Sequence, residues 1–484
     1  MSCRAFLLIH MAKPEIDIFS QHKVSVMAPA GCGKTELITA SLRYGAAGKP
    51  ALVLTHTNAG RAALEHRLKR AGVDASVARV ATLDGWAIRV VQSFPKRSGL
   101  ADGTLRVQGV AADYVGIRAA ALQILLAGHI SKVIQATYSR VIVDEYQDCG
   151  IPQHAIVVAL SNLLPTAVLG DSLQAIFNFA GPVVDWNKDV TPNFSALPSL
   201  QTPWRWNRAG ASELGDWLLN VVRPALHASQ SIDLVTAPKQ VEWVKLTGSP
   251  TEFPEQRLAA AKKHYTNASV LLIADSANKQ SQWDAAARGR AHMVEALDMK
   301  DFVEFSARFD ALGDDALEKA IAFAGSLMSG LSPQDLVKRT RSLESGRART
   351  HASHLESLAL QYCRKPSFGA AADLLEKFCK SSEIYIYRPD VARLCIKALR
   401  AANAGATFQA AAIKERERFR HMGRTMPHRA VGSTLLLKGL ESDVAVVLEP
   451  ERMNARHLYV ALTRGSQKLV ICSKQSVLVP STKP

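Results

Sequence analysis

The sequence has 484 residues, with 59 Lys and Arg against 43 Asp and Glu, which gives a formal net charge of +16. Hydrophobic residues make up 48% of the chain and charged residues 21%, so it can bury folded cores and is not a disordered protein. It is too long for one ordinary domain, and no segment approaches the ~20 apolar residues of a membrane span. Seven cysteines without a CxxC pair favour neither a disulfide framework nor a zinc module. We therefore expect a cytoplasmic protein of two or three domains with no membrane partner.

The excess of positive charge favours a polyanionic partner, with nucleic acid first among the candidates. Solubility alone would also account for it. Composition leaves these two explanations open, and the motifs must decide between them.

In the first part of the chain, short apolar segments alternate with segments of helical periodicity. This alternation predicts a parallel sheet covered by helices on both faces. A helical stretch at about 92–138 resembles a small insertion into this domain. The expected strands are 24–28, 51–55, 77–81, 140–143 and 167–170, and the expected helices include 36–44, 58–72 and 86–91.

The second part repeats the pattern with an interruption. A buried strand is expected at 268–273, followed by an almost purely helical segment at about 281–425. Strands are expected again in STLLL (433–437), VAVVLE (444–449) and KLVICS (468–473). This order predicts a second α/β domain that carries a helical insertion.

A glycine-containing segment, Ala28-Pro-Ala-Gly-Cys-Gly-Lys-Thr35, lies between the first strand and the first helix. Backbone N–H groups in such a loop, together with the following helix N-terminus, form a cradle for phosphates. Lys34 would reach the β- and γ-phosphates of ATP, and the Thr35 hydroxyl would hold Mg²⁺. An ordinary strand–turn–helix is the alternative. The phosphate-binding interpretation gives these nucleotide-binding residues: Ala30, Gly31, Cys32, Gly33, Lys34, Thr35 and Glu36.

An acidic pair, Asp144 and Glu145, follows the apolar strand at 140–143. Carboxylates at the carboxyl end of a buried strand lie where open α/β sheets bind ligands. Asp144 would hold the metal and Glu145 would activate the attacking water. The alternative is a strand that runs into an acidic, solvated turn.

Seven segments, in order along nearly the whole chain, resemble the motifs of UvrD/Rep-type superfamily-1 DNA helicases. The acidic segment DEYQD (144–148) resembles the DEFQD signature of that family. The other six are LTHTNAG (54–60), ATLDGWAIRV (81–90), LGDSLQAIFNFAG (169–181), LQTPWRW (200–206), LLLKGLESDVAVVL (435–448) and LYVALTRGSQKL (458–469).

The resemblance implies two RecA-like parallel-sheet P-loop domains with small, mainly helical insertions. The implied domains are 1–200 for the first, 201–280 and 426–484 for the second, and 281–425 for the helical insertion in the second.

The resemblance also assigns roles to residues that local patterns alone would not single out. Gln174 would sense the γ-phosphate, and Arg205 and Arg464 would be arginine fingers contributed by the second α/β domain. Trp204 would stack on adenine, and Glu441 would contact the nucleotide sugar or a phosphate-linked network.

For DNA, the resemblance implies that Thr57, Asn58 and Thr82 contact the strand backbone. Phe179 would stack on a base, for which any aromatic face suffices. Its alternative is an ordinary core residue. Ala180 replaces the arginine that the family has beside this position, which predicts weaker coupling.

Two basic runs, at 338–349 and 414–424, are further candidates for DNA contact; a solvated helix face with internal ion pairs is the alternative. Cys32 is expected to be a small filler of the loop rather than a redox switch.

The implied function is an ATP-dependent helicase or translocase on single-stranded DNA, with 3′→5′ movement and Mg²⁺ as the metal; duplex DNA is a further candidate partner. The compact insertions resemble the helicase component of bacterial anti-phage systems, including the Gabija type, which implies a nuclease-ATPase protein partner. The alternative is a nucleotide-switched DNA-binding subunit that activates a nuclease with little unwinding of its own.

Overall fold

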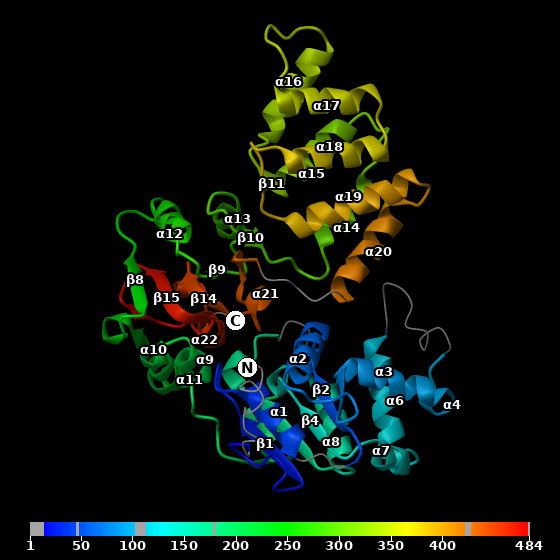
Figure 1. Ribbon diagram of the computed structural model, residues 1–484, viewed down its shortest axis with the longest axis vertical. Coiled ribbons are helices and arrows are strands. Elements are labelled where there is room, and N and C mark those ends of the chain that lie inside the picture. The colour runs from blue at the N-terminus through cyan, green and yellow to red at the C-terminus, as the bar shows by residue number, and fades with distance from the viewer. Residues whose placement is uncertain (1–13, 45–47, 102–112, 178–180, 422–426, 483–484) are drawn as a thin grey trace, which may run out of the picture. The chain divides into compact units, whose positions relative to one another are not determined.

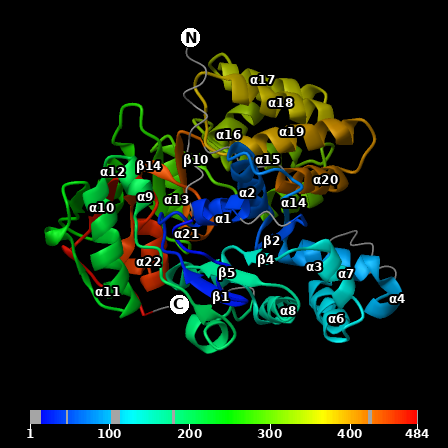
Figure 2. The ribbon, with the colours of Figure 1, turned by 60° about the horizontal axis from the view of Figure 1, so that its bottom comes forward.

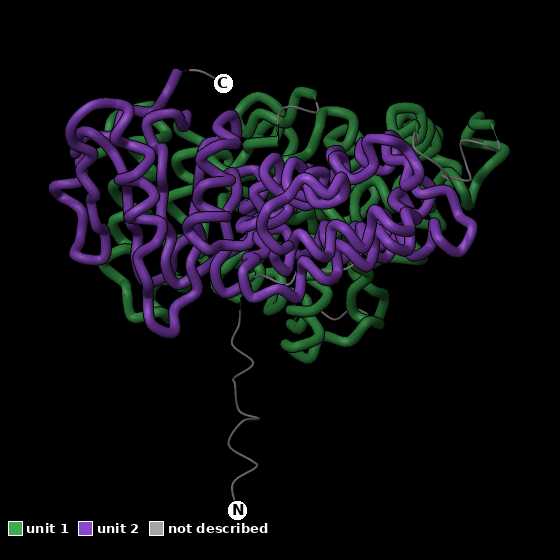
Figure 3. Tube along the Cα trace, turned by 90° about the horizontal axis from the view of Figure 1, so that it is seen from above, with its two compact units in different colours: residues 1–232, 455–463 green, residues 233–454, 464–484 purple. Residues whose placement is uncertain are grey.

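The computed structural model, drawn from two sides in Figures 1 and 2, describes residues 14–44, 48–101, 113–177, 181–421 and 427–482. The chain divides into two compact units, coloured separately in Figure 3. The first comprises Met1–Ile232 and Ala455–Thr463, and the second comprises Asp233–Asn454 and Arg464–Pro484. The first unit thus extends beyond the domain boundary at residue 200 that the motifs predict, and it includes a helix from near the end of the chain.

The first unit contains a six-stranded parallel sheet in the order β3-β2-β4-β5-β1-β6. Three of its strands, Ala51–Thr55, Val141–Val143 and Thr166–Gly170, are buried at every residue, because helices cover both faces of the sheet. The strands are β1 (Lys23–Met27), β2 (Ala51–Thr55), β3 (Ala78–Thr82), β4 (Val141–Val143), β5 (Thr166–Gly170) and β6 (Ser195–Ala196).

Alternating side chains of these strands build two separate cores. Val53 and Ile142 pack with α1 and α2 on one face, whereas Leu54 and Val143 pack with α3, α6 and α8 on the other. The main helices are α1 (Lys34–Tyr44), α2 (Asn58–Arg70), α3 (Leu83–Ser93), α4 (Pro95–Ser98), α6 (Tyr114–Leu126), α7 (Ser131–Thr137), α8 (Ile151–Ser161), α9 (Trp204–Arg208), α10 (Ser212–Trp217), α11 (Arg223–His227) and α22 (Ala455–Leu462).

The second unit contains another six-stranded parallel sheet, in the order β10-β13-β9-β14-β15-β8. Helices α12 (Phe253–Lys262) and α13 (Lys279–Ala287) contribute to the core on one of its faces. The strands are β8 (Val241–Lys245), β9 (Val270–Ala274), β10 (His292–Met293), β13 (Arg429–Ser433), β14 (Ser442–Val447) and β15 (Gly465–Ser473). The predicted α/β class with two parallel sheets is therefore confirmed.

A helical subdomain interrupts this second sheet between β10 and β13. It comprises α14 (Lys300–Arg308), α15 (Ala316–Gly325), α16 (Pro333–Glu344), α17 (His354–Arg364), α18 (Phe368–Lys380), α19 (Pro389–Asn403) and α20 (Phe408–His421), with the short strand pair β11 (Met328–Ser329) and β12 (Tyr385–Ile386).

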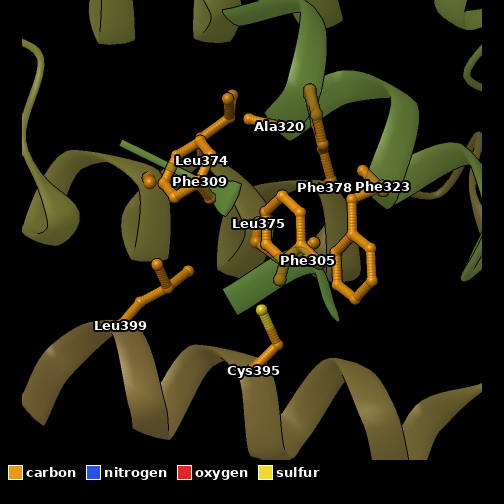
Figure 4. Close-up of a pocket in the computed structure, with 11 residues that line it drawn as sticks. Phe305, Phe309, Ala320, Phe323, Leu374, Leu375, Phe378, Cys395 and Leu399 are labelled. Atoms are coloured by element: carbon orange, nitrogen blue, oxygen red, sulfur yellow. The ribbon is translucent and has the colours of Figure 1, made fainter. Parts of the chain in front are cut away.

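An aromatic cluster forms the core of the helical subdomain. Phe305 and Phe323 stack with ring centroids 3.9 Å apart, beside a small apolar cavity of about 10 Å³ (Figure 4). A cavity of this size has room for about one water molecule, so the cluster is a packed core and not a ligand pocket.

Two sequence predictions about the second unit were wrong. Residues 434–437 form a helical turn, α21 (Thr434–Leu437), and the strand lies just before it, in β13. The run of leucines indicates burial, but it does not distinguish a strand from a helix of this length. The helical insertion also begins later than residue 281, because β10 still pairs with β13 in the sheet.

Within the described residues, no single helix combines the length and apolar character needed to cross a membrane. Helices α6 and α7 meet those criteria of length and composition only as a pair, bent by 95°.

Candidate nucleotide and DNA site

The loop between β1 and α1 has the backbone geometry of a phosphate cradle. Gly31 and Gly33 adopt φ values of +71° and +86°, which residues with a side chain rarely adopt. Lys34 and Thr35 then begin an 11-residue helix, so the positive end of its dipole faces the loop. Glu36 is exposed in the first turn of that helix. The loop could therefore hold the phosphates of a nucleotide.

The structure brings Lys34 together with both predicted acidic residues. Its Nζ lies 3.0 Å from Asp144 Oδ1 and 2.6 Å from Glu145 Oε1. Burial would lower the pKa of Lys34, but the two carboxylates outweigh that effect and raise it. Burial also raises the pKa of Asp144, against the opposing effect of Lys34. The loop and the acidic pair thus form one charged cluster at the carboxyl edge of the sheet.

Glu145 has a strained backbone. It is a non-glycine residue with φ +55° and ψ +42°, the left-handed region that costs such a residue of order 1 kcal/mol or more. The turn Tyr146–Asp148 follows directly. Residues held in this way are concentrated at functional sites.

A chain of hydrogen bonds joins Glu145 to the predicted γ-phosphate sensor. Gln147 donates from Nε2 to Glu145 Oε2 (2.6 Å), and its Oε1 accepts from the backbone N–H of Asp171 (3.0 Å). Asp171 Oδ2 in turn accepts from Gln174 Nε2 (3.0 Å) and from the backbone N–H of Ala30 (3.2 Å). Gln147 and Asp171, which the sequence argument did not assign, therefore connect the acidic pair, the sensor and the loop.

The segment Trp204–Trp206 packs directly on the glycine loop. A Cβ added at Gly33 would lie 2.9 Å from Trp204 Cδ1, and one at Gly31 would lie 2.6 Å from Trp206 Cζ3. Both positions thus need glycine for close approach as well as for φ. Trp204 is 42% exposed, and the Arg208 guanidinium lies over its ring, 5.7 Å from the centroid.

Arg205 differs from its predicted placement. We expected it in the second α/β domain, but it lies in the same compact unit as Lys34. Its backbone N–H donates to the Gly31 carbonyl (3.1 Å), and its Nη1 donates to the Thr463 carbonyl (2.6 Å). The motif alone could not show this, because LQTPWRW lies between the two predicted domains.

A cationic residue missed by the sequence argument contacts the predicted metal ligand Thr35. Arg67, near the end of α2, donates from Nη1 to Thr35 Oγ1 (2.9 Å). Arg67 lies about two helical turns after the motif at 54–60, and no local sequence pattern marks it. Only the packing of α2 beside α1 brings it to the loop.

The predicted DNA contacts Thr57, Asn58 and Thr82 meet at one edge of the sheet. Thr55 of β2 pairs with Thr82 of β3, so the N-termini of α2 and α3 emerge side by side. Thr57 and Thr82 cap these helices, accepting from Gly60 and Gly85 N–H groups at 3.0 Å each. Nearby, the rings of His56 and Phe177 stack with centroids 6.3 Å apart. Phe179 and Ala180 lie outside the described residues.

The remaining predicted nucleotide residues lie in the second unit. Arg464 is buried, precedes β15 and donates from Nη1 to the Leu440 carbonyl (3.1 Å). Glu441 is exposed immediately before β14. Their predicted roles as an arginine finger and a sugar contact stay predictions.

Five of the ten Lys and Arg residues in the two basic runs form ion pairs within the second unit, and Arg424 lies outside the described residues. Arg339 pairs with Glu356, and Arg341 pairs with Glu318 and Glu344. In the second run, the pairs are Arg416–Glu417, Arg418–Glu415 and Arg420–Glu417. These contacts favour the solvated, internally paired helix face over a dedicated DNA surface.

Comparison with known proteins gives a family match and similarities to solved helicase structures. Residues 110–194 match the model of the UvrD/REP helicase N-terminal domain. No curated protein matches the sequence.

Among solved structures, an arterivirus nonstructural protein 10 helicase in complex with DNA has 10% identity and a TM-score of 0.35, covering 95% of this chain and 63% of its own. The Pif1 helicase from Bacteroides, in complex with ADP-AlF3 and ssDNA, has 15% identity and a TM-score of 0.26, covering 55% and 54%. The chain thus spans less than two thirds of either structure's length. The family match lies on the segment that carries Asp144, Glu145, Asp171 and Gln174.

Proposed function

We propose that this protein is an ATP-driven DNA helicase or translocase of superfamily 1, similar to UvrD and Rep, that moves along single-stranded DNA. The observation that carries the proposal is the cluster of Lys34, Asp144 and Glu145, joined by hydrogen bonds to Gln174. The family match to residues 110–194 supports it. The net charge of +16 is consistent with a nucleic-acid partner.

The loop and acidic pair fit a nucleoside triphosphate with its metal. Gly31 and Gly33, both at positive φ, shape the loop that would surround the phosphates, and Lys34 follows at its end. Thr35 and Asp144 supply hard oxygen ligands of the kind that Mg²⁺ prefers. When bound, Mg²⁺ would neutralise phosphate charge. Glu145 would accept a proton from the attacking water, held in place by its backbone and by Gln147.

Coupling to DNA would use the neighbouring edge of the same sheet. The N-termini of α2 and α3 present backbone N–H groups at adjacent strand ends, an arrangement that suits two successive phosphates. The chain from Glu145 through Gln147 and Asp171 to Gln174 would transmit the state of the γ-phosphate toward the segment leading to Phe177. ATP hydrolysis would thereby change the affinity of this edge for the DNA strand.

The finer parts of the proposal rest on the sequence resemblance. They are movement in the 3′→5′ direction, adenine stacking by Trp204, arginine fingers at Arg205 and Arg464, cytoplasmic location, and action with a nuclease-ATPase partner in anti-phage defence.

The decisive experiment measures ATP hydrolysis and strand displacement on the same preparation. We expect single-stranded DNA to stimulate hydrolysis, and displacement on a duplex with a 3′ tail but not with a 5′ tail. Glu145→Gln is the matched inactive control. DNA-stimulated hydrolysis without displacement would favour the alternative, a nucleotide-switched subunit that activates a nuclease. Absence of ATP hydrolysis in the parent with DNA present would reject the proposal.

A further inference from the structure

Asp171 is a fully buried carboxylate immediately beside the phosphate-binding loop. Its side chain is 0% exposed, and it accepts hydrogen bonds from Ala30 N–H and Gln174 Nε2 on Oδ2. A buried carboxylate is costly without a cation, and this one stands where an anionic ligand would bind. The structure must therefore supply a nearby positive charge.

That charge comes from Arg223, the first residue of α11. Its Nη1 lies 2.9 Å from Asp171 Oδ1, and its side chain is only 11% exposed. The guanidinium also lies over the Tyr459 ring, 5.8 Å from the centroid. The Tyr459 hydroxyl accepts from the same Ala30 N–H at 3.2 Å. Arg223 thus contacts both residues that accept a hydrogen bond from the Ala30 N–H, namely Asp171 and Tyr459.

Helix α11 makes a second contact, with the short helix η2 (Ser172–Gln174), which contains the predicted γ-phosphate sensor Gln174. His227 Nε2 lies 3.2 Å from Ser172 Oγ. Arg223 and His227 lie four residues apart, on one face of the same short helix. Arg223 forms an ion pair with Asp171, and His227 lies within hydrogen-bond distance of Ser172. The segment RPALH belongs to no motif that the sequence argument used, so only the fold reveals this contact.

We infer that Arg223 is a positioning residue for the nucleotide site: it neutralises Asp171 so that this carboxylate can orient Gln174 and Ala30 beside bound phosphates. The inference rests on the proposed function of the loop. Arg223 acts through Asp171 and need not touch the nucleotide. Without the arginine, an uncompensated buried carboxylate would repel the phosphates and release Gln174.

The test is titration of ATPγS, ADP and adenosine into the full chain by calorimetry. Arg223→Gln should weaken ATPγS binding about 10- to 100-fold, as expected for one charge acting over several ångströms at an effective dielectric near 20. ADP binding should weaken less, and adenosine binding should not change. A role in folding alone would not depend on the phosphate charge.

Three variants separate charge from packing. Arg223→Lys keeps the charge and should retain most of the affinity. The double variant Arg223→Gln/Asp171→Asn removes both charges and should bind ATPγS more tightly than Arg223→Gln alone. Arg140→Gln is the matched control, because Arg140 lies in the same unit at the amino end of β4, against Phe19. It should bind like the parent.

Equal ATPγS affinity in Arg223→Gln and the parent would overturn the inference, and so would a double variant no better than Arg223→Gln. If Arg223→Gln does not fold, the double variant is compared with the parent instead. It lacks the carboxylate that orients Gln174, so it should bind ATPγS more weakly than the parent, and parental affinity would overturn the inference. Failure of the proposed function looks different: the parent would not bind ATPγS, or Lys34→Ala would bind it as tightly as the parent.

Discussion

The two parallel sheets of this protein have the same number of strands but very different carboxyl edges. In the first sheet, Lys34 at the end of the glycine loop pairs with Asp144 and Glu145. A chain of hydrogen bonds connects Glu145 through Gln147 and Asp171 to Gln174. In the second, Glu449 accepts from Asn278 Nδ2 (2.5 Å) and from the Asp275 N–H (3.2 Å), and lies 3.7 Å from Arg257. The segment after β9, Asp275–Asn278, contains no glycine and forms no comparable cradle.

A second group at that edge attaches the helical subdomain. Glu295, which follows β10, receives two hydrogen bonds of 2.8 Å from Arg388 at the start of α19. Arg388 also pairs with Asp301 of α14. The second edge therefore uses its charges to hold its own elements together, whereas the first presents charges around a loop that could bind phosphates. The same sheet architecture supports both uses, so function must be argued from the side chains.

The largest effect that distinguishes the edges should come from Glu145→Gln. The amide keeps the shape of the side chain but cannot accept a proton, so single-turnover ATP hydrolysis should fall roughly 10²- to 10⁴-fold. ATPγS affinity should remain within a few-fold of the parent because Lys34 and the loop are intact. The matched control is Glu449→Gln in the second sheet, which should hydrolyse ATP at the parental rate per folded molecule. Equal rates in Glu145→Gln and the parent would contradict the site assignment.

The next effect concerns stability of the second unit. Arg388→Met should leave Glu295 buried without its cation, which typically costs about 3–5 kcal/mol. The double change Arg388→Met/Glu295→Met should recover most of that loss, because it removes both charges. Calorimetric unfolding measures the loss, and ATPγS titration should show that nucleotide affinity is kept. A single variant as stable as the parent would show that this pair does not anchor the subdomain.

A smaller effect compares two helix caps. Thr57→Ala removes the cap of α2 at the predicted DNA edge, and Asn278→Ala removes the cap of α13, whose side chain accepts from Ser281 N–H at 3.2 Å. Thr57→Ala should cost about 1 kcal/mol of stability. Asn278→Ala should cost more, because it also removes the hydrogen bond that Asn278 donates to the buried Glu449. Only Thr57→Ala should also weaken single-stranded DNA binding, by about fivefold if one phosphate contact of that size is lost. Equal DNA affinities, measured by fluorescence anisotropy, would remove Thr57 from the DNA track.

Many strands and the charged residues of the first sheet edge could be predicted from the sequence, because short local patterns determine them. Strand β2 matched its predicted limits because ALVLT is a buried, mostly apolar run bounded by Pro50 and His56. The motifs also singled out Lys34, Asp144 and Glu145, since the two carboxylates directly follow β4 and Lys34 follows the glycine loop after β1. Arg67 and Arg223 were missed because their contacts join elements distant in sequence. Gln147 lies inside the motif at 144–148, but the hydrogen bond that it accepts from Asp171 is also distant in sequence. The unit to which Arg205 belongs was missed for the same reason, as was the short edge strand β10, whose pairing depends on β13.

The smallest expected effect concerns Cys32, in the middle of the glycine loop. Burial raises the pKa of its thiol to about 12, and the nearby Asp171 carboxylate adds to that shift. A raised pKa keeps the thiol protonated as the pH rises toward 12, so at pH 8 only about one molecule in 10⁴ carries the reactive thiolate. Iodoacetamide at pH 8 should therefore leave Cys32 unmodified and ATP hydrolysis unchanged, while the partly exposed Cys363 is labelled first of the two. Peptide mass spectrometry alongside the ATPase assay checks both sites. Rapid labelling of Cys32 with loss of hydrolysis would mean that the loop opens to solvent and that its cysteine is a reactive group rather than a small filler.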